Sequence, residues 1–276
     1  MPTIAANDIE ICYESFGPDD APPLLLVMGL GAQMTLWSPG FISELLERGF
    51  RVIRFDNRDV GLSSKSEGDP PDVMAIYGAA LSGEPVEAPY SLSTMAADAV
   101  GLLDALEIPA AHVVGASMGG MIVQMMAIEH PDRVLSMTSI MSTTGAGDVG
   151  QPDPEAMTAL LTPPPADRAG AIEATVTTSR IIAGSLFDED EARARATEAY
   201  ARCFHPVGTA FQIAAVAATG DRTERLRGVE APTLVVHGRE DPLVTLSGGE
   251  ATAAAVAGSD LVVYGLMGHD VPRLYW

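Results

Sequence analysis

Basic residues are scarce in this sequence of 276 residues. Lysine occurs only once, as Lys65, and 16 Lys and Arg residues stand against 37 Asp and Glu residues, which gives a formal net charge of −21. A chain this acidic repels phosphate backbones and anionic membranes, so we expect neither nucleic acid nor a membrane as a partner. A lone lysine in a Ser/Gly-rich stretch also argues against a Walker loop and against Schiff-base chemistry.

Cysteine and long apolar runs are scarce as well. Cys12 and Cys203 are the only two cysteines and have no metal-ligand or redox spacing, so we expect no disulfide scaffold and no metal site. No apolar run reaches the roughly 20 residues of a bilayer span, and residues 1–8 do not resemble a secretion signal. A glycine-rich turn begins at Gly29, but Met34 replaces the third glycine of a dinucleotide fingerprint. These absences predict a cytoplasmic protein without a cofactor.

Short apolar, β-branched runs alternate with helical patterns along most of the chain. This alternation is typical of an α/β fold, with a mostly parallel sheet covered by helices on both faces. We expect eight strands, over residues 4–6, 9–16, 24–28, 51–55, 112–115, 134–141, 233–237 and 261–264. Helical patterns lie between several of them, over residues 41–47, 95–106, 119–129 and 249–257.

Two stretches interrupt this alternation. Residues 66–91 contain four prolines and predict a long excursion with a short helix over residues 74–81. Residues 146–220 carry no strand pattern and instead predict helices, over residues 167–182, 188–203 and from Pro206 onward. We therefore expect a helical cap, residues 146–220, inserted between the sixth and seventh strands. Residues 1–145 and 221–276 would form the core.

The strongest motif is a G-x-S-x-G pentapeptide centred on Ser117, between an expected strand and an expected helix. A sharp strand-to-helix turn strains the backbone at the serine and crowds its neighbours, so sterics favour Gly115 and Gly119 on either side. Such a turn presents the hydroxyl at the carboxyl edge of the sheet, where ligands bind in open α/β sheets. Ser117 is therefore the candidate nucleophile, and a serine that merely caps the helix is the alternative.

A serine hydroxyl needs a base within hydrogen-bond reach, and five histidines are available. His269 follows the last expected strand and so lies at the same sheet edge as Ser117. His112 begins a strand and points to the opposite edge. Helix capping or packing is the expected role of the other three, His130, His205 and His237. We take His269 as the candidate base.

The base in turn needs an acid that fixes its tautomer and stabilises the imidazolium. Asp241, just before Pro242, lies at the end of the seventh expected strand and is the favoured candidate. Weaker rivals are Glu240, Asp148 and Asp270. The chain order Ser117, Asp241, His269 is the nucleophile, acid, base order of α/β-hydrolases.

Two backbone amides are candidates for an oxyanion hole. One belongs to Met118, directly after the nucleophile, and the other to Leu30, in the loop after the third strand. Together with Trp37 and Met141, these residues are also candidates for lining an apolar acyl pocket. Methionine and tryptophan near strand ends are equally common as core residues, so the pocket roles stay open.

From Asp8 to His269 the sequence resembles the α/β-hydrolase superfamily, especially bacterial esterases similar to aclacinomycin methylesterase and, more distantly, enol-lactonases. Residues 56–63 are similar to the family's D-x-R-G-x-G-x-S turn, with Asp59 in place of the usual glycine. Met28 stands where many members have histidine. Relatives continue past the position of Trp276 into a helix, so a chain ending there is expected to expose an apolar patch beside the last strand.

The triad and the resemblance imply a serine hydrolase that cleaves a small-molecule carboxylic ester through an acyl-enzyme, without a cofactor. The same triad serves cofactor-free perhydrolases (haloperoxidases), lactonases and carbon–carbon bond hydrolases, and these three activities stay open. A ligand sensor that keeps the fold without turnover is the non-enzyme possibility. A homo-oligomer is compatible with the sequence.

Overall fold

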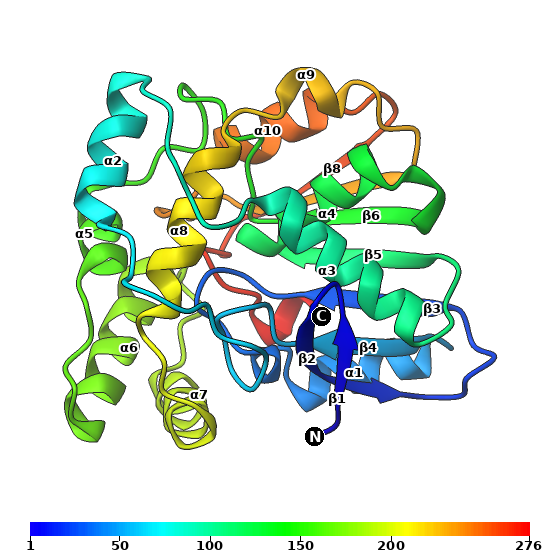
Figure 1. The fold of residues 1–276 in the computed structure, drawn as a ribbon, viewed down its shortest axis with the longest axis horizontal. Helices are drawn as coiled ribbons and strands as arrows, with labels where there is room; N and C mark the ends of the chain where they lie inside the picture. The colour runs from blue at the N-terminus through cyan, green and yellow to red at the C-terminus, as the bar shows by residue number, and fades with distance from the viewer.

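The computed structural model describes residues 1–80 and 82–276. Its strands are β1 (Thr3–Ala6), β2 (Ile9–Phe16), β3 (Pro23–Val27), β4 (Arg51–Phe55), β5 (Ala111–Ala116), β6 (Val134–Ile140), β7 (Thr233–Gly238) and β8 (Asp260–Tyr264). They form one eight-stranded sheet in the order β1-β2-β4-β3-β5-β6-β7-β8 (Figure 1). β2 pairs antiparallel with β1 and β4, and every other neighbouring pair is parallel. The predicted eight-stranded, mostly parallel sheet is confirmed.

Helices cover both faces of this sheet. They are α1 (Pro39–Glu47), α2 (Val73–Ser82), α3 (Leu92–Ala105), α4 (Met118–Glu129), α5 (Pro154–Leu161), α6 (Arg168–Ile182), α7 (Glu189–Arg202), α8 (Gly208–Thr219), α9 (Thr223–Leu226) and α10 (Leu246–Ala255). In β3, Leu25 and Val27 join the core cluster of α3 and α4, whereas Leu24 and Leu26 join the cluster that contains Ile42 of α1. The near-continuous apolar run of β3 thus follows from burial on both faces.

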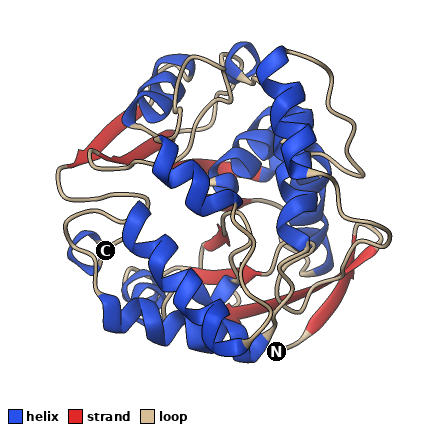
Figure 2. Cartoon of the chain, turned by 90° about the vertical axis from the view of Figure 1, so that its left-hand side faces the viewer, coloured by secondary structure: helices blue, strands red, loops and turns tan.

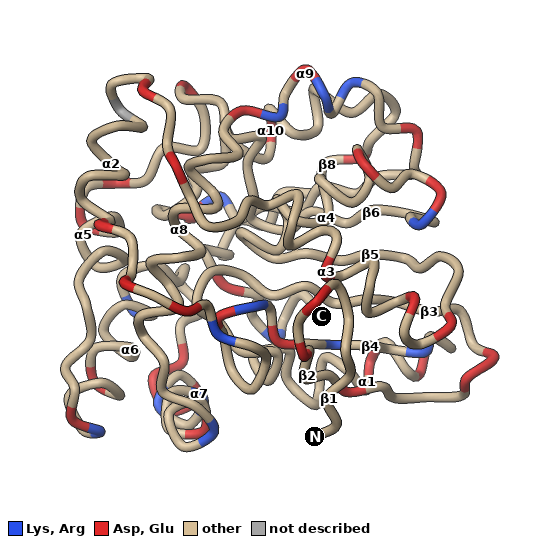
Figure 3. The backbone as a smooth tube through the Cα atoms, viewed as in Figure 1, with Lys and Arg blue, Asp and Glu red and all other residues tan. Residues whose placement is uncertain are grey.

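The helices α5 to α9 lie between β6 and β7, where the sequence predicts a helical insertion, and α9 follows the predicted bounds of residues 146–220. With α2, the helices α5 to α8 gather on one side of the sheet, at the left of Figure 1, and Figure 2, viewed from that side, shows them in front of the strands. Within the described residues, no helix combines the length and apolar character of a membrane span. Asp and Glu are spread along the whole backbone rather than gathered in one place (Figure 3).

Several details of the helices differ from expectation, including the first residues of α1, α3 and α10. Two helices were not predicted from the sequence: α5, which lies between two proline-rich segments, and α9, which has only four residues and so no detectable periodicity. α8 begins at Gly208, because Pro206 lies in the turn before it. The short helix expected over residues 74–81 is α2, and residue 81 itself lies outside the described residues.

The structure explains why an aspartate, Asp59, can stand where similar sequences have glycine. It adopts a left-handed backbone conformation (φ 68°), which aspartate tolerates better than most residues. Its buried carboxylate accepts hydrogen bonds from the backbone and hydroxyl of Ser66 and from the hydroxyl of Tyr90. These two partners stand at the two ends of the 66–91 excursion. Asp59 therefore holds the base of the excursion together.

A buried arginine joins the two points where the insertion leaves and rejoins the core. Arg222 is 1% exposed and donates to the carbonyls of Thr143 and Gly220 and to Gln124. Burial lowers the pKa of its guanidinium to about 10, and the nearby charge of Asp221 only partly offsets this effect. A second buried contact between the insertion and the core is the ion pair between Arg202 of α7 and Asp56, with 2.7 Å between nitrogen and oxygen. The insertion is thus fixed to the core at several buried points.

The edge strand β8 leaves apolar side chains in solvent. Leu261 is 37% exposed and Val262 36%, and Leu266 in the following loop is 44% exposed. Three apolar side chains are therefore partly exposed on the last strand and in the loop that follows it.

Candidate active site

Ser117 occupies a strained turn between β5 and α4. Its backbone angles are φ 56° and ψ −121°, a conformation that residues with a Cβ rarely adopt. A Cβ on Gly115 would clash with the carbonyl of Gly119, and a Cβ on Gly119 would clash with the carbonyl of Val27. The side chain of Ser117 makes no helix-capping hydrogen bond, so this serine does not merely cap the helix. The turn instead leaves its hydroxyl free for another partner.

That partner is the imidazole of His269, which comes from the loop after β8. Its Nε2 lies 2.8 Å from the Oγ of Ser117, and its Nδ1 lies 2.8 Å from Oδ2 of Asp241. Because a carboxylate can only accept, Nδ1 donates to Asp241, and the lone pair of Nε2 faces the serine hydroxyl. The structure thus brings together three residues that lie far apart in the chain.

Asp241 is held rigidly at the end of β7. It is 4% exposed, and its Oδ1 accepts hydrogen bonds of 2.9 Å from the amides of Leu243 and Val244. These bonds close a turn typical of aspartate and leave Oδ2 for His269. The carboxylate therefore cannot rotate away from the imidazole without losing two backbone hydrogen bonds.

The three rival carboxylates have other surroundings. Glu240 accepts from the backbone and hydroxyl of Ser185, and Asp270 accepts from the amide of Gly268. Asp148 is exposed in the loop after β6. Among the carboxylates of the described residues, only that of Asp241 forms a hydrogen bond with the His269 ring.

The loop after β3 lies directly against the nucleophile. A Cβ on Gly29 would lie 3.1 Å from the Cβ of Ser117. The amide of Gly31 donates to Oε1 of Gln212, 2.8 Å away. Within the described residues, the amides of Leu30 and Met118 donate to no protein acceptor, so both are available as donors. Their role in an oxyanion hole remains a prediction.

Gln212 is a site-forming residue that was not predicted from the sequence. It is fully buried in α8, and its amide nitrogen donates to the carbonyl of Arg58 while its oxygen receives the amide of Gly31. A helix of the insertion thereby supports the candidate oxyanion loop. The only signal in the sequence is that Gln212 is the one amide side chain in an otherwise apolar and small-residue helix.

Comparison with known proteins shows the family to which this chain belongs. Residues 22–272 match the family model described as alpha/beta hydrolase fold. The chain belongs to this family. It is 29% identical over 300 residues to rhodomycin D methylesterase DnrP of Streptomyces peucetius, covering 99% of this chain and 93% of that protein. It is 26% identical over 275 residues to 3-oxoadipate enol-lactonase 2 of Acinetobacter baylyi, covering 95% and 87%.

Solved structures agree on the fold of this α/β-hydrolase. The meta-cleavage product hydrolase CumD of Pseudomonas fluorescens superimposes with a TM-score of 0.76 at 24% identity, over 98% of this chain and 90% of that one. At this level of identity the likeness concerns the fold alone.

The candidate pocket residues divide between two core clusters. Trp37 and Met141 are 3% and 7% exposed and belong to the cluster on the α1 side of the sheet. Leu30 and Met118 pack in the cluster on the α3 and α4 side. The structure therefore does not bring these four side chains into one described cavity, and a role of Trp37 and Met141 in an acyl pocket remains a prediction.

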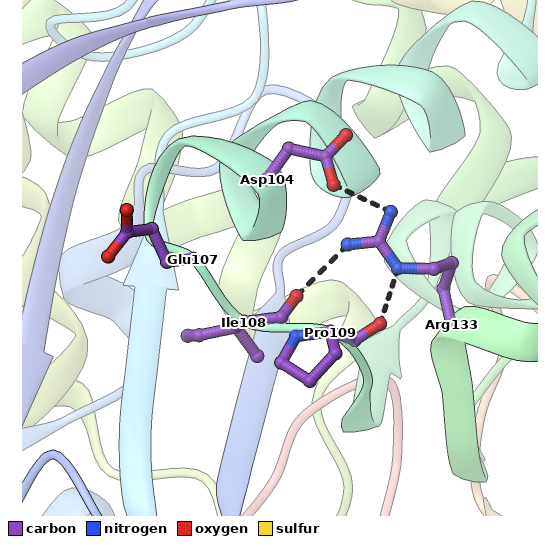
Figure 4. A pocket seen from close by; sticks show the side chains of 5 residues that line it. All are labelled: Asp104, Glu107, Ile108, Pro109 and Arg133. Carbon is purple, nitrogen blue, oxygen red and sulfur yellow. Dashed lines mark hydrogen bonds and ion pairs between the residues drawn. The ribbon is translucent and has the colours of Figure 1, made fainter.

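The hollow of about 450 Å³ shown in Figure 4 lies elsewhere on this α/β-hydrolase. It is formed by Asp104, Glu107, Ile108, Pro109 and Arg133, where α3 ends and the chain enters β5. Arg133 donates to the carbonyls of Ile108 and Pro109 and pairs with Asp104 at 2.7 Å. This hollow is at the amino edge of the sheet, opposite Ser117.

Within the described residues, no group of three metal-ligating side chains forms a metal site.

His237 lies next to Asp241, the candidate acid, and binds the turn that carries it. It is fully buried in β7, its Nε2 lies 2.7 Å from the carbonyl of Val244, and it is 3.7 Å from Oδ2 of Asp241. Nε2 donates to the carbonyl, which leaves Nδ1 unprotonated and packed against Gly249. Burial lowers the pKa of His237 from its ordinary value of 6.5. A neutral His237 thus holds the turn that carries Asp241.

We expect the His237→Gln variant to lose part of the acid sensitivity of the fold. Because the pKa of His237 is lowered in the folded state, the unfolded chain binds its proton first as pH falls below 6.5. The wild type then loses up to about 1.4 kcal/mol of stability per pH unit at this residue. Glutamine keeps a donor for Val244 but does not titrate. Urea unfolding at pH 7.5 and 5.5 measures the difference, and equal losses in both proteins would contradict this role.

Proposed function

We propose that this α/β-hydrolase is a serine esterase that cleaves small-molecule carboxylic esters through an acyl-enzyme. Two hydrogen bonds support this most directly. One joins Oγ of Ser117 to Nε2 of His269, the other joins Nδ1 of His269 to Oδ2 of Asp241, and each is 2.8 Å long. A nucleophile, a base and an orienting acid in contact are the requirement for activating a serine hydroxyl.

In the proposed reaction, Oγ of Ser117 attacks the ester carbonyl carbon while Nε2 of His269 takes the hydroxyl proton. The imidazolium is stabilised by the carboxylate of Asp241 and then returns the proton to the leaving alcohol. A water molecule, activated by the same imidazole, attacks the acyl-enzyme and releases the carboxylic acid.

The amides of Leu30 and Met118 would bind the oxyanion of the tetrahedral intermediate. Both donors are backbone groups on segments fixed by packing, so they need no reorganisation when the charge develops. Each such donor contributes about 3 kcal/mol to stabilisation of the transition state in related chemistry. Met28 in place of a histidine leaves these backbone donors intact.

We propose that residues 146–220 act as a cap domain over a core of residues 1–145 and 221–276, and that the cap selects the substrate with the 66–91 excursion. Helix α8 supports this, because Gln212 binds the oxyanion loop and Thr209 lies close to Gly31 of the same loop. Helix α2 of the excursion packs against α8. The insertion therefore reaches the loop after β3 through α8, and the excursion contacts the same helix.

A lactone is the second candidate substrate, because a lactone is a cyclic ester and 3-oxoadipate enol-lactonase 2 is similar over 95% of this chain. A methyl ester is favoured by the longer match to rhodomycin D methylesterase. A panel of nitrophenyl esters, methyl esters and lactones, assayed by release of acid, tests the proposal. Multiple turnovers with esters are expected, and no turnover with any ester or lactone would contradict it.

Three further activities can be distinguished from ester cleavage in the same assays. Bromination that depends on peroxide and acetate, faster than ester cleavage, would assign a perhydrolase; "Putative non-heme bromoperoxidase BpoC" of Mycobacterium tuberculosis matches half of this chain. Cleavage of a vinylogous 1,5-diketone, faster than that of esters, would assign a carbon–carbon bond hydrolase. A stoichiometric burst without turnover would indicate a ligand sensor.

A further inference from the structure

The end of helix α6 in the insertion is in backbone contact with the loop that carries His269. The amide of His269 donates a 2.7 Å hydrogen bond to the carbonyl of Ile182, the last residue of α6. The last carbonyls of a helix have no partner within the helix, so this bond satisfies one of them. The backbone position of the candidate base is thereby fixed by the insertion and not by the core alone.

Next to this bond, two glycines allow the segments to touch. A Cβ on Gly184 would lie 2.5 Å from the amide nitrogen of Gly268 and 2.5 Å from the carbonyl oxygen of Leu266. A Cβ on Gly268 would in turn clash with Gly184 and Ala183. No side chain fits between the two backbones, so their spacing is set by direct contact.

The same segment also holds the loop of the candidate acid. The carboxylate of Glu240 accepts from the backbone (2.6 Å) and the hydroxyl (2.9 Å) of Ser185, and the amide of Glu240 donates to the carbonyl of Met267. The carboxyl of Asp270 accepts from the amide of Gly268. Residues 182–185, which we call the 182–185 turn, therefore contact the loops of both the base and the acid.

We propose that the 182–185 turn is a positioning element of the triad, with Gly184 as its key residue, so that the insertion sets the geometry of proton transfer in addition to covering the site. This inference rests on the proposed function. Nε2 of His269 must stay within hydrogen-bond reach of Ser117 while Nδ1 stays within reach of Asp241. A misplacement of about 1 Å is enough to reduce catalysis about 100-fold, so a small shift of the His269 backbone has a large effect.

The Gly184→Ala variant tests the proposal, because the added methyl group must push the 182–185 turn and the His269 loop apart. We expect kcat for a nitrophenyl ester to fall about 10-fold to 100-fold while KM changes less than about twofold. The matched control is Gly147→Ala in the same insertion, where an added Cβ meets no atom within 4 Å. This control is expected to keep the wild-type kcat. A folded Gly184→Ala protein with an unchanged kcat would overturn the proposal.

Two measurements keep the test decisive. If Gly184→Ala does not fold, the variant Glu240→Ala removes both contacts to Ser185 at the exposed rim, and an unchanged kcat in this variant would overturn the proposal. The hydrogen-bonded Nδ1 proton of His269, observed by NMR, reports the geometry without any turnover. We expect its signal to shift or disappear in Gly184→Ala and to stay in Gly147→Ala. An unchanged signal refutes the positioning role, whereas a wild type that cleaves no ester refutes only the proposed function.

Discussion

In the Ser117→Ala variant, kcat for a nitrophenyl ester is expected to fall by a factor on the order of 10⁴ to 10⁶, because no other group near His269 can form the acyl-enzyme. Serine hydroxyl and alanine methyl occupy similar space, and the hydroxyl bonds only to His269 in the described structure. The fold should therefore survive, with circular dichroism and thermal unfolding close to those of the wild type.

Ser136→Ala is the matched control for this variant. Ser136 lies in the first half of β6, towards the opposite edge of the sheet from Ser117, and its hydroxyl lies 2.7 Å from Nδ1 of His112. Its loss is expected to leave kcat within about twofold, since it touches no part of the triad. Ester cleavage by Ser117→Ala at more than a tenth of the wild-type rate would rule out Ser117 as the nucleophile.

The Asp241→Asn variant is expected to lose about 10⁴-fold in kcat with little change in KM. An asparagine oxygen can still accept from the amides of Leu243 and Val244, which directs the NH₂ group toward His269. The imidazole then has to accept at Nδ1 and carry its proton on Nε2, so it cannot take the proton of Ser117. Steady-state kinetics on the same ester measure the loss.

Asp148→Asn removes one of the rival carboxylates and serves as the control, because Asp148 is exposed in the loop after β6. We expect it to retain wild-type kinetics. A loss of less than 10-fold in Asp241→Asn would move the orienting role to another carboxylate.

The sheet and the three triad positions could be predicted because their signals are local. The apolar runs of parallel strands are buried on both faces, and the turn at Ser117 requires glycines at fixed positions by sterics alone. The chain order of the nucleophile, acid and base then places all three at ends of parallel strands, which lie at one edge of the sheet. Each of these inferences depends on a few neighbouring residues.

The contacts between the insertion and the core could not be predicted in the same way. Gln212 binds Gly31 across 181 positions of the chain, and Ile182 binds His269 through its backbone carbonyl. Every residue has a backbone carbonyl, so the residue type at position 182 does not indicate that it accepts this hydrogen bond. A single glutamine in a helix likewise does not reveal its partner. The role of the glycine at position 184 depends equally on a segment that lies far along the chain.

The roles of Trp37 and Met141 cannot be decided from residue type. Both stand near strand ends, as pocket residues would, yet their side chains are almost fully buried in the α1-side core. An apolar side chain at the end of a strand can turn toward either the site or the core, and residue type does not distinguish the two. A role of these two residues in an acyl pocket therefore stays a prediction.

The most direct measurement of the central claim is covalent labelling with a nitrophenyl phosphonate, followed by peptide mass spectrometry. A phosphonate reacts only with a serine whose proton is taken by a nearby base, so it reports the triad independently of the natural substrate. One phosphonyl group per chain is expected on Ser117, together with slow or no labelling of the His269→Ala variant. A wild-type chain that stays unlabelled, or that carries the label on another residue, would contradict the assignment.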